Sequence, residues 1–264
     1  MTYILFFIVC FGASIVGAIC GIGGGVIIKP VLDSFGILSV SAISFLSGCT
    51  VLSMTTYSVL HNKLDKSAAL KGEQDHAKLP LAIGAAVGGL LGKEMFSYVK
   101  SLSDDPNHVG AVQAACLLIV TIGTLLYTIY KSYIRTHQVK NTAVSVLIGL
   151  FLGIMSSFLG IGGGPINLVV LFFFFSMTTK QAAESSLYII FFSQAASLIS
   201  TIVTGAVPSV EIGLLLLMVA GGILGGICGR SINKKIDEKT VDKLFIGLMV
   251  VMILINIYNI YKYL

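Results

Sequence analysis

The sequence Gly21-Ile22-Gly23-Gly24-Gly25 breaks an apolar stretch that otherwise reads as a membrane helix, and the same five residues recur at Gly160 to Gly164. Glycine inside a helix costs about 1 kcal/mol relative to alanine, so this density predicts a break in each helix. In hydrocarbon, a broken helix is tolerated only where its freed backbone groups are buried in protein or line a cavity. Two such breaks, at matching positions in two halves of a chain, predict the binding site of a transporter.

The composition is that of a polytopic membrane protein. Hydrophobic residues make up 56% of the 264 positions and charged residues only 11%, and long apolar stretches recur along the whole chain. Residues 1–3 lead directly into apolar sequence without a basic region, so we expect no cleaved signal peptide. The net charge of +5 lies in loops. It therefore reports orientation in the lipid bilayer and gives no reason to expect a nucleic-acid partner.

The chain carries an internal duplication. The two glycine words are related by a displacement of 139 (160 − 21), and Gly88 to Gly92 matches Gly221 to Gly225 at a displacement of 133 (221 − 88). Duplication predicts an all-α fold made of two repeats, residues 1–140 and 141–264. The apolar segments that predict its helices are 3–20, 25–36, 38–60, 79–99, 109–131, 142–159, 165–178, 181–204, 210–229 and 241–261.

The basic residues decide between two topologies. If each glycine-broken segment crosses the membrane once, the 17 cations divide 8 against 9 between the two faces. If residues 3–36 and 142–178 instead form hairpins that return to the side they entered from, 13 of the 17 lie on one face, which is the asymmetry that membrane proteins show. The second topology leaves three full crossings in each half: 38–60, 79–99 and 109–131, then 181–204, 210–229 and 241–261.

An odd number of crossings makes the two repeats inverted, so the hairpins enter from opposite faces and their glycine tips can meet near the midplane. Both termini are then expected on the non-cytoplasmic side. The depth of the first arm stays open, because residues 3–20 at about 1.5 Å per residue nearly span a bilayer.

The glycine tips are candidates for an anion site. A new helix follows each turn, and Pro165 suits a first helical position. Such helix N-termini present unpaired N–H groups and about half a positive charge, which favours a small anion. The alternative is that the glycines only allow close helix packing. The site glycines are Gly21, Gly23, Gly24, Gly25, Gly160, Gly162, Gly163 and Gly164.

Polar residues beyond the turns extend this candidate substrate site. Ser47 and Ser186 are related by the same displacement as the glycine words, and Asn167 lies on the adjacent arm. Their hydroxyl and amide donors suit an oxyanion, although interhelical hydrogen bonds are an ordinary alternative. Lys29 either adds to the anion field or extends outward to the membrane surface, and Asp33 is its candidate partner. Lys180 and Glu184 are spaced as an i,i+4 ion pair.

Enzymatic motifs are weak or missing. The histidines His61, His76, His108 and His137 fall in predicted loops, so we expect no metal site, and no nucleotide or other cofactor motif is present. Transport would then depend on an ion gradient, with protons as a candidate coupling ion, on the substrate gradient or on a separate ATPase. A second class of function is a membrane enzyme that handles a thiol or a lipid, and the residues that would support it are Cys20 and Cys49. We expect these two cysteines, like Cys10, Cys116 and Cys228, to be reduced and packed. A non-transporting assembly subunit is a third class, and an oligomer remains open.

The sequence resembles the sulfite exporter TauE/SafE family. The resemblance rests on both glycine words, on Pro165 directly after the second, on Ala183 to Leu187, and on Pro80 with Gly88 to Gly92. It implies a multi-pass permease in the prokaryotic inner or plasma membrane. It also implies a small anionic substrate, such as sulfite or an organosulfur compound. The first copy departs from the second where Lys29, Pro30 and Phe45 replace Leu168, Val169 and Glu184, which leaves the substrate and the direction of transport open.

Overall fold

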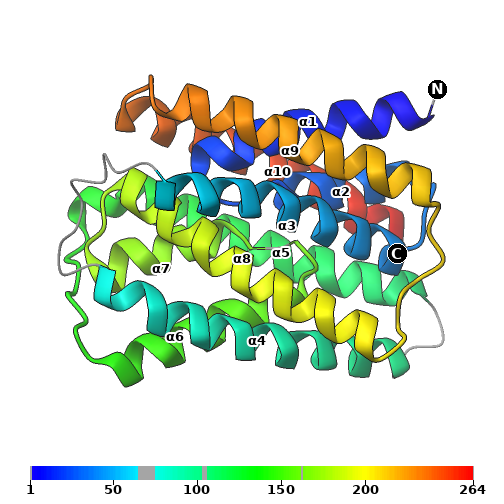
Figure 1. Ribbon diagram of the computed structural model, residues 1–264, viewed down its shortest axis with the longest axis horizontal. Helices are drawn as coiled ribbons and strands as arrows, with labels where there is room; N and C mark the ends of the chain where they lie inside the picture. Colours follow the sequence, from blue (N-terminus) through cyan, green and yellow to red (C-terminus); the bar gives the residue numbers. More distant parts are fainter. Residues whose placement is uncertain (1, 65–74, 103–105, 162, 264) are drawn as a thin grey trace.

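The computed structural model describes residues 2–64, 75–102, 106–161 and 163–263, and all regular structure in these residues is helical (Figure 1). Each of the ten apolar segments predicted from the sequence is a helix, so the all-α prediction is confirmed. The α-helices are α1 (Thr2–Cys20), α2 (Gly25–Phe35), α3 (Val40–Leu64), α4 (Asp75–Ser101), α5 (Pro106–Tyr130), α6 (Thr142–Phe158), α7 (Pro165–Phe175), α8 (Thr179–Val203), α9 (Ile212–Asn233) and α10 (Glu238–Tyr263), with a 3₁₀ turn, η1 (Lys131–Tyr133), after α5.

Seven described helices are long and apolar enough to cross a membrane: α1, α3, α4, α5, α8, α9 and α10. The three others are shorter, since α2 and α7 have 11 residues each and α6 has 17. At about 1.5 Å per residue, an 11-residue helix covers roughly half of a bilayer core. Helices α2 and α7 therefore extend only part of the way through the fold, whereas α1 has the length of a full crossing.

Helices α2 and α7 each form a hairpin with the helix before them, which is α1 for the first hairpin and α6 for the second. The residues that precede α6 bond to the end of α7, since the His137 and Val139 N–H groups donate to the carbonyls of Phe173 and Phe174. Phe6 near the start of α1 shares an apolar cluster with Leu32 near the end of α2. In Figure 1, α1 begins and α10 ends at one end of the bundle, whereas α6 and α7 meet their flanking loops at the opposite end. The two hairpins thus enter the bundle from opposite ends.

The first arm of each hairpin, α1 or α6, packs against a row of glycines spaced one turn apart on another helix, which we call a glycine stripe. The glycines of α9 lie against α1, and those of α4 lie against α6, so each first arm is packed by a helix from the other half of the chain. Added Cβ atoms would meet backbone carbonyl groups one helical turn apart. Such stripes let two backbones approach closely, as small residues do in membrane proteins. The pairs are Gly221, Gly225 and Gly229 with Phe7, Phe11 and Ile15, and Gly84, Gly88 and Gly92 with Val146, Leu150 and Ile154.

We expect Gly88→Ala to destabilise the protein by roughly 1–3 kcal/mol, because the new methyl group would overlap the Leu150 carbonyl oxygen. Gly123→Ala is the matched control, since a Cβ there meets nothing within 4 Å and alanine is the better helix former. Thermal unfolding of the purified protein in detergent measures the effect. Equal melting temperatures for the two variants would show that the stripe does not set the helix spacing.

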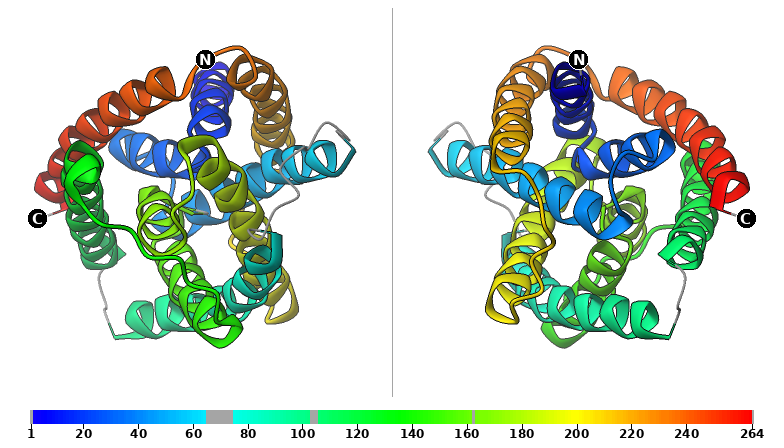
Figure 2. Two further views of the ribbon diagram at one scale, coloured as in Figure 1. Left: turned by 90° about the vertical axis from the view of Figure 1, so that its left-hand side faces the viewer. Right: turned by 90° about the vertical axis from the view of Figure 1, so that its right-hand side faces the viewer.

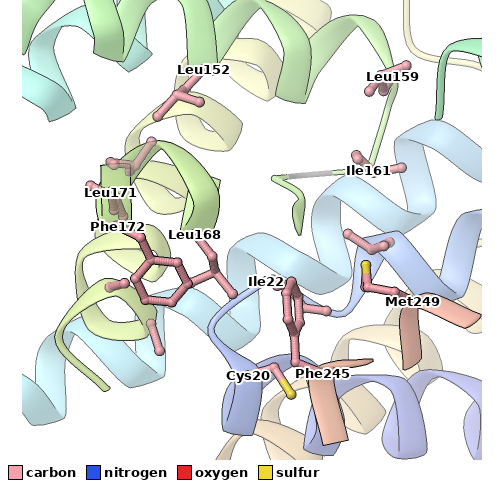
Figure 3. Packing of buried hydrophobic residues seen from close by; sticks show 14 of the residues in the cluster. Cys20, Ile22, Leu152, Leu159, Ile161, Leu168, Leu171, Phe172, Phe245 and Met249 are labelled. Atoms are coloured by element: carbon pink, nitrogen blue, oxygen red, sulfur yellow. The ribbon is translucent and has the colours of Figure 1, made fainter. Parts of the chain in front are cut away.

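The apolar core surrounds both glycine turns (Figure 3). Ile22 from the first turn and Ile161 from the second belong to one buried cluster, together with Leu168 of α7 and Phe245 of α10. The cluster also contains Cys20, which is fully buried. At the edge of the bundle, α5 and α10 lie side by side, as the end-on views of Figure 2 show. Apolar packing therefore holds both turns in place.

Two sequence predictions need correction. His61, His76 and His108 lie within helices α3, α4 and α5, because these helices continue beyond the apolar segments that predicted them. Cys228 is exposed on α9 and not packed, since the glycine face of that helix, not its cysteine, turns toward α1. The remaining four cysteines are buried or half-buried, and all five are free thiols.

Candidate functional site

The two glycine turns touch one another through their backbones. A Cβ on Gly25 would collide with the carbonyl oxygen of Ile161, so no side chain separates the turns at this point. Gly21 and Gly160 occupy equivalent positions and have nearly the same left-handed backbone, with φ of 73° and 64°. Glycine adopts this conformation without strain, which explains why these turns need it. Helices α2 and α7 begin directly after the turns, and Pro165 occupies the first turn of α7 as predicted.

One face of helix α3 packs against both glycine turns. Its Ser44 Oγ is 2.7 Å from the place where a Cβ on Gly160 would be, and its Val51 contacts the Gly25 position. Ser47 lies between these two residues on the same helical face, because positions three and four apart are neighbours on a helix. It is completely buried. The structure therefore puts the Ser47 hydroxyl beside the contact between the two turns.

Helix α8 makes the equivalent contact from the other half. Cβ atoms on Gly21 and Gly163 would collide with Ala183 and Ile190 of α8. Ser186 lies between these two α8 residues on the same face, is also completely buried, and accepts a hydrogen bond of 3.3 Å from Asn167 Nδ2. The structure thus joins Ser186 and Asn167, which the sequence had placed in one site.

Several buried polar atoms near the turns have no hydrogen-bond partner in the described part of the chain. Ser47 Oγ and Asn167 Oδ1 are two of them, although both side chains are almost wholly inaccessible. Ser14 Oγ of α1 is another, and it lies 3.1 Å from the place where a Cβ on Gly24 would be. An unpaired buried polar group costs roughly 1–3 kcal/mol. These atoms are donors and acceptors that either buried water or a small polar ligand satisfies.

A polar cavity of about 90 Å³ leads from one end of the bundle to the second glycine turn. We call it cavity A, and its walls come from α3, α4, α5, α8 and the end of α6. Ser44 and Gly160 belong to its lining, and Lys93 and Lys100 of α4 give it positive charge. No acidic residue lines it in the described part of the chain.

A second cavity, cavity B, lies near the first glycine turn and has a volume of about 60 Å³. Ala183, which contacts the Gly21 position, lines it together with Ala18 of α1 and Ser58 at the far end of α3. Its charged lining residues are Lys180, Glu184, Arg230 and Lys234.

The two cavities are built from corresponding positions of the two halves. Ser44 and Phe45 line cavity A, and their equivalents in the second repeat, Ala183 and Glu184, line cavity B. The displacement that relates the glycine words also relates Ser58 of cavity B to Ser197 of cavity A. Ser47 and Ser186 line neither cavity, because they lie in the packed junction between them.

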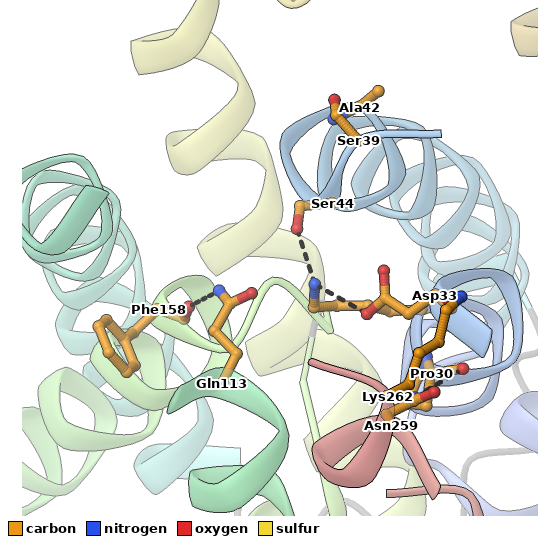
Figure 4. A network of polar contacts seen from close by, with 10 residues as sticks. Pro30, Asp33, Ser39, Ala42, Ser44, Gln113, Phe158, Asn259 and Lys262 are labelled. Atoms are coloured by element: carbon orange, nitrogen blue, oxygen red, sulfur yellow. Dashed lines mark hydrogen bonds and ion pairs between the residues drawn. The ribbon is translucent and has the colours of Figure 1, made fainter. Parts of the chain in front are cut away.

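The Lys29 side chain is buried and paired (Figure 4). It is only 3% exposed, so the alternative that it extends outward to the membrane surface is wrong. Its Nζ lies 3.4 Å from Asp33 Oδ2 and donates to Ser44 Oγ at 3.1 Å. Asp33 is therefore the partner of Lys29, and Ser44 links this pair to the wall of cavity A.

The predicted ion pair between Lys180 and Glu184 is wrong. Lys180 Nζ donates instead to the carbonyl oxygen of Ile236, in the turn before α10, at 2.7 Å. Glu184 is exposed on the wall of cavity B. The Lys180 ammonium group thus bonds to the loop between α9 and α10 and not to Glu184. The spacing of residues along α8 cannot predict this contact with a distant segment.

The polar residues of cavity A that the sequence did not predict as site residues include Lys93, Gln113 and Gln194. Gln113 of α5 donates a 2.6 Å hydrogen bond to the Phe158 carbonyl next to the second glycine turn, and its Oε1 is unpaired (Figure 4). A signal was present, because a polar side chain within an apolar membrane segment marks a functional position by default.

The site glycines and polar residues of the sequence analysis lie around this junction, apart from Gly162, which is outside the described residues. The family model described as Sulfite exporter TauE/SafE matches residues 6–255, which is nearly the whole chain. No curated protein and no solved structure matches the chain.

Proposed function

Because the chain belongs to the sulfite exporter TauE/SafE family, and is therefore a membrane transporter, we propose that it is a permease for small anions, with sulfite or a related sulfur oxyanion as its substrate. The substrate would bind at the junction of the two glycine turns. The membrane would be the inner or plasma membrane of a prokaryotic cell.

The charge of the two cavities supports an anionic substrate. Cavity A has two lysines and no acidic residue among its described lining, and cavity B has three basic residues and one glutamate. A cleft lined by one sign of charge concentrates ions of the opposite sign. Beyond the cavities, the starts of α2 and α7 and the buried hydroxyl of Ser47 offer donors to the oxygens of a small oxyanion.

The paired cavities support alternating access around one site. They approach the junction from opposite ends through equivalent positions of the two halves, as two inverted repeats, residues 1–140 and 141–264, would require. The junction itself is closed to both cavities, since Ser47 and Ser186 are completely buried. We infer that rocking of the hairpins opens cavity A or cavity B to the junction in turn. The cysteines of the enzyme hypothesis, Cys20 and Cys49, are not among the described residues of either cavity.

We expect purified protein in proteoliposomes to move sulfite down an imposed gradient, faster than empty vesicles do. The measurement is uptake of radiolabelled sulfite, sulfoacetate, sulfate and small carboxylates, with and without a pH gradient. Tetrahedral and pyramidal oxyanions fit donors that converge from two helix ends, so the sulfur oxyanions should move fastest.

The control is a large, membrane-impermeant organic anion, such as a polysulfonated dye, which is too large for cavities of about 60 and about 90 Å³. Failure of every small anion in the panel would contradict the proposed function and would favour a non-transporting role. Preference for carboxylates over sulfur oxyanions would retain a permease but reject its substrate.

A further inference from the structure

Lys29 and Asp33 form a buried pair of opposite charges at the edge of the proposed anion path. The aliphatic part of Lys29 lies along Gly160, with its Cδ 3.6 Å from the place where a Cβ would be, and its Nζ contacts Ser44 Oγ at 3.1 Å. Gly160 and Ser44 both line cavity A. An anion that moves from cavity A to the junction therefore passes within reach of the Lys29 ammonium group.

The pair occurs in only one half of the chain. In the second repeat, Lys29 corresponds to Leu168, Asp33 to Phe172 and Ser44 to Ala183. All three polar residues are thus replaced together by apolar ones, and Leu168 and Phe172 pack in the main apolar cluster. A buried ion pair is weak evidence for stability, since apolar residues of similar volume serve as well. The second half demonstrates this replacement, which indicates that the first half keeps its charges for a function.

Among the described residues, Lys29 is the ion-pair partner of the Asp33 carboxylate, and two residues of α10, Lys262 and Tyr263, also act on it. From α10, Lys262 Nζ donates to the backbone carbonyl oxygens of Asp33 and Ser34 at the end of α2. The hydroxyl group of Tyr263, also from α10, faces the Asp33 carboxyl group. From α3, Ser44 contacts Lys29. Asp33 is only 6% exposed, and its Oδ1 has no hydrogen-bond partner among the described residues.

We propose that Lys29 and Asp33 couple anion movement to proton movement, in an inference that rests on the proposed anion transport. An anion arriving at Lys29 takes the place of Asp33 as the partner of the ammonium group. Asp33 would then be a buried carboxylate that has lost its ion-pair partner and keeps only the Tyr263 hydroxyl and the charge of Lys262 near it, so it binds a proton and becomes neutral. Lys29 keeps its own proton throughout.

Departure of the anion reverses each step. When the anion leaves toward cavity B, the Lys29 ammonium group returns to Asp33, and the carboxylic acid releases its proton and becomes a carboxylate again. The proton is taken up while the path to cavity A is open and released while the path to cavity B is open, so one proton crosses the membrane with each anion and no other bond is made or broken. For one proton per anion, a gradient of one pH unit raises the accumulation ratio of the anion about tenfold.

Proteoliposomes with a clamped membrane potential test this coupling through sulfite uptake and a pH dye in the lumen. Wild-type protein is expected to accumulate sulfite in proportion to the imposed pH gradient. Asp33→Asn keeps the size and polarity of the side chain but binds no proton, so it should exchange sulfite across the membrane with its response to the pH gradient lost. Sulfite itself titrates near neutral pH, so the difference between wild type and Asp33→Asn reports the proton that the protein carries.

Glu94→Gln, which removes an exposed carboxylate of α4, is the matched control and should behave as wild type. If Asp33→Asn does not fold, the double change Lys29→Leu with Asp33→Phe installs the residue pair of the second half and keeps the test available. Sulfite movement by wild type that ignores the pH gradient, or equal pH responses in wild type and both variants, would overturn the coupling while leaving the transport function intact. Absence of any sulfite movement by wild type would instead reject the proposed function.

Discussion

Gly25→Ala is expected to reduce anion flux to about a tenth of the wild-type rate or less, while the protein remains inserted in the membrane. The added methyl group would overlap the carbonyl oxygen of Ile161, and neither backbone can move aside cheaply because both turns are packed in the apolar core. Overpacking of this kind costs roughly 1–3 kcal/mol, which corresponds to about 5- to 150-fold in the population of the closed junction, a range that contains the expected loss of flux. Sulfite uptake into proteoliposomes with equal protein content measures the effect.

Gly12→Ala provides the matched control for Gly25→Ala. It adds the same methyl group to the same hairpin, at a position on α1 where nothing lies within 4 Å, so its flux should equal that of wild type. Gly163→Leu is a companion change in the second turn, because φ of 127° disfavours any side chain and Ile190 fills the adjacent space. Wild-type flux in either Gly25→Ala or Gly163→Leu would contradict the proposed site at the turns.

The glycine words made the hairpins predictable from sequence. A break in an apolar helix is a local property, and the displacement between two copies identifies equivalent positions without knowledge of the fold. This is why the sequence led to Ser47 and Ser186, which the structure buries beside the turns from α3 and α8.

The walls of the site depend on contacts between distant segments and were less predictable. Gln113 and Gln194 meet in cavity A from α5 and α8, and the packing of α4 on α6 and α8 brings Lys93 to the same cavity. From the sequence, Lys29 could either add to the anion field or extend outward to the membrane surface, because its position one turn after Gly25 is compatible with both. The structure decides between them through Ser44 and Asp33, which hold the ammonium group inside the protein.

The proposed inverted arrangement of the two halves predicts opposite accessibility of two equivalent positions. Phe45 lines cavity A, and Glu184, its equivalent in the second repeat, lines cavity B. We expect Phe45→Cys and Glu184→Cys to react with a membrane-impermeant maleimide from opposite faces of the membrane. Cavity B carries most of its charge as lysine and arginine, so the positive-inside rule places Glu184→Cys on the cytoplasmic face. Labelling of intact cells and of inverted vesicles provides the measurement.

The five native cysteines must first be replaced, so that each labelled thiol is the introduced one. The cysteine-free protein is the blank, and labelling after the membranes are dissolved in detergent shows that the reagent is active. If the hairpins enter from opposite ends, Phe45→Cys is labelled only in intact cells and Glu184→Cys only in inverted vesicles. Labelling of both cysteines from the same face would mean that the cavities open to one side. A single junction served by two cavities would then be impossible, since alternating access needs a separate path to each face of the membrane.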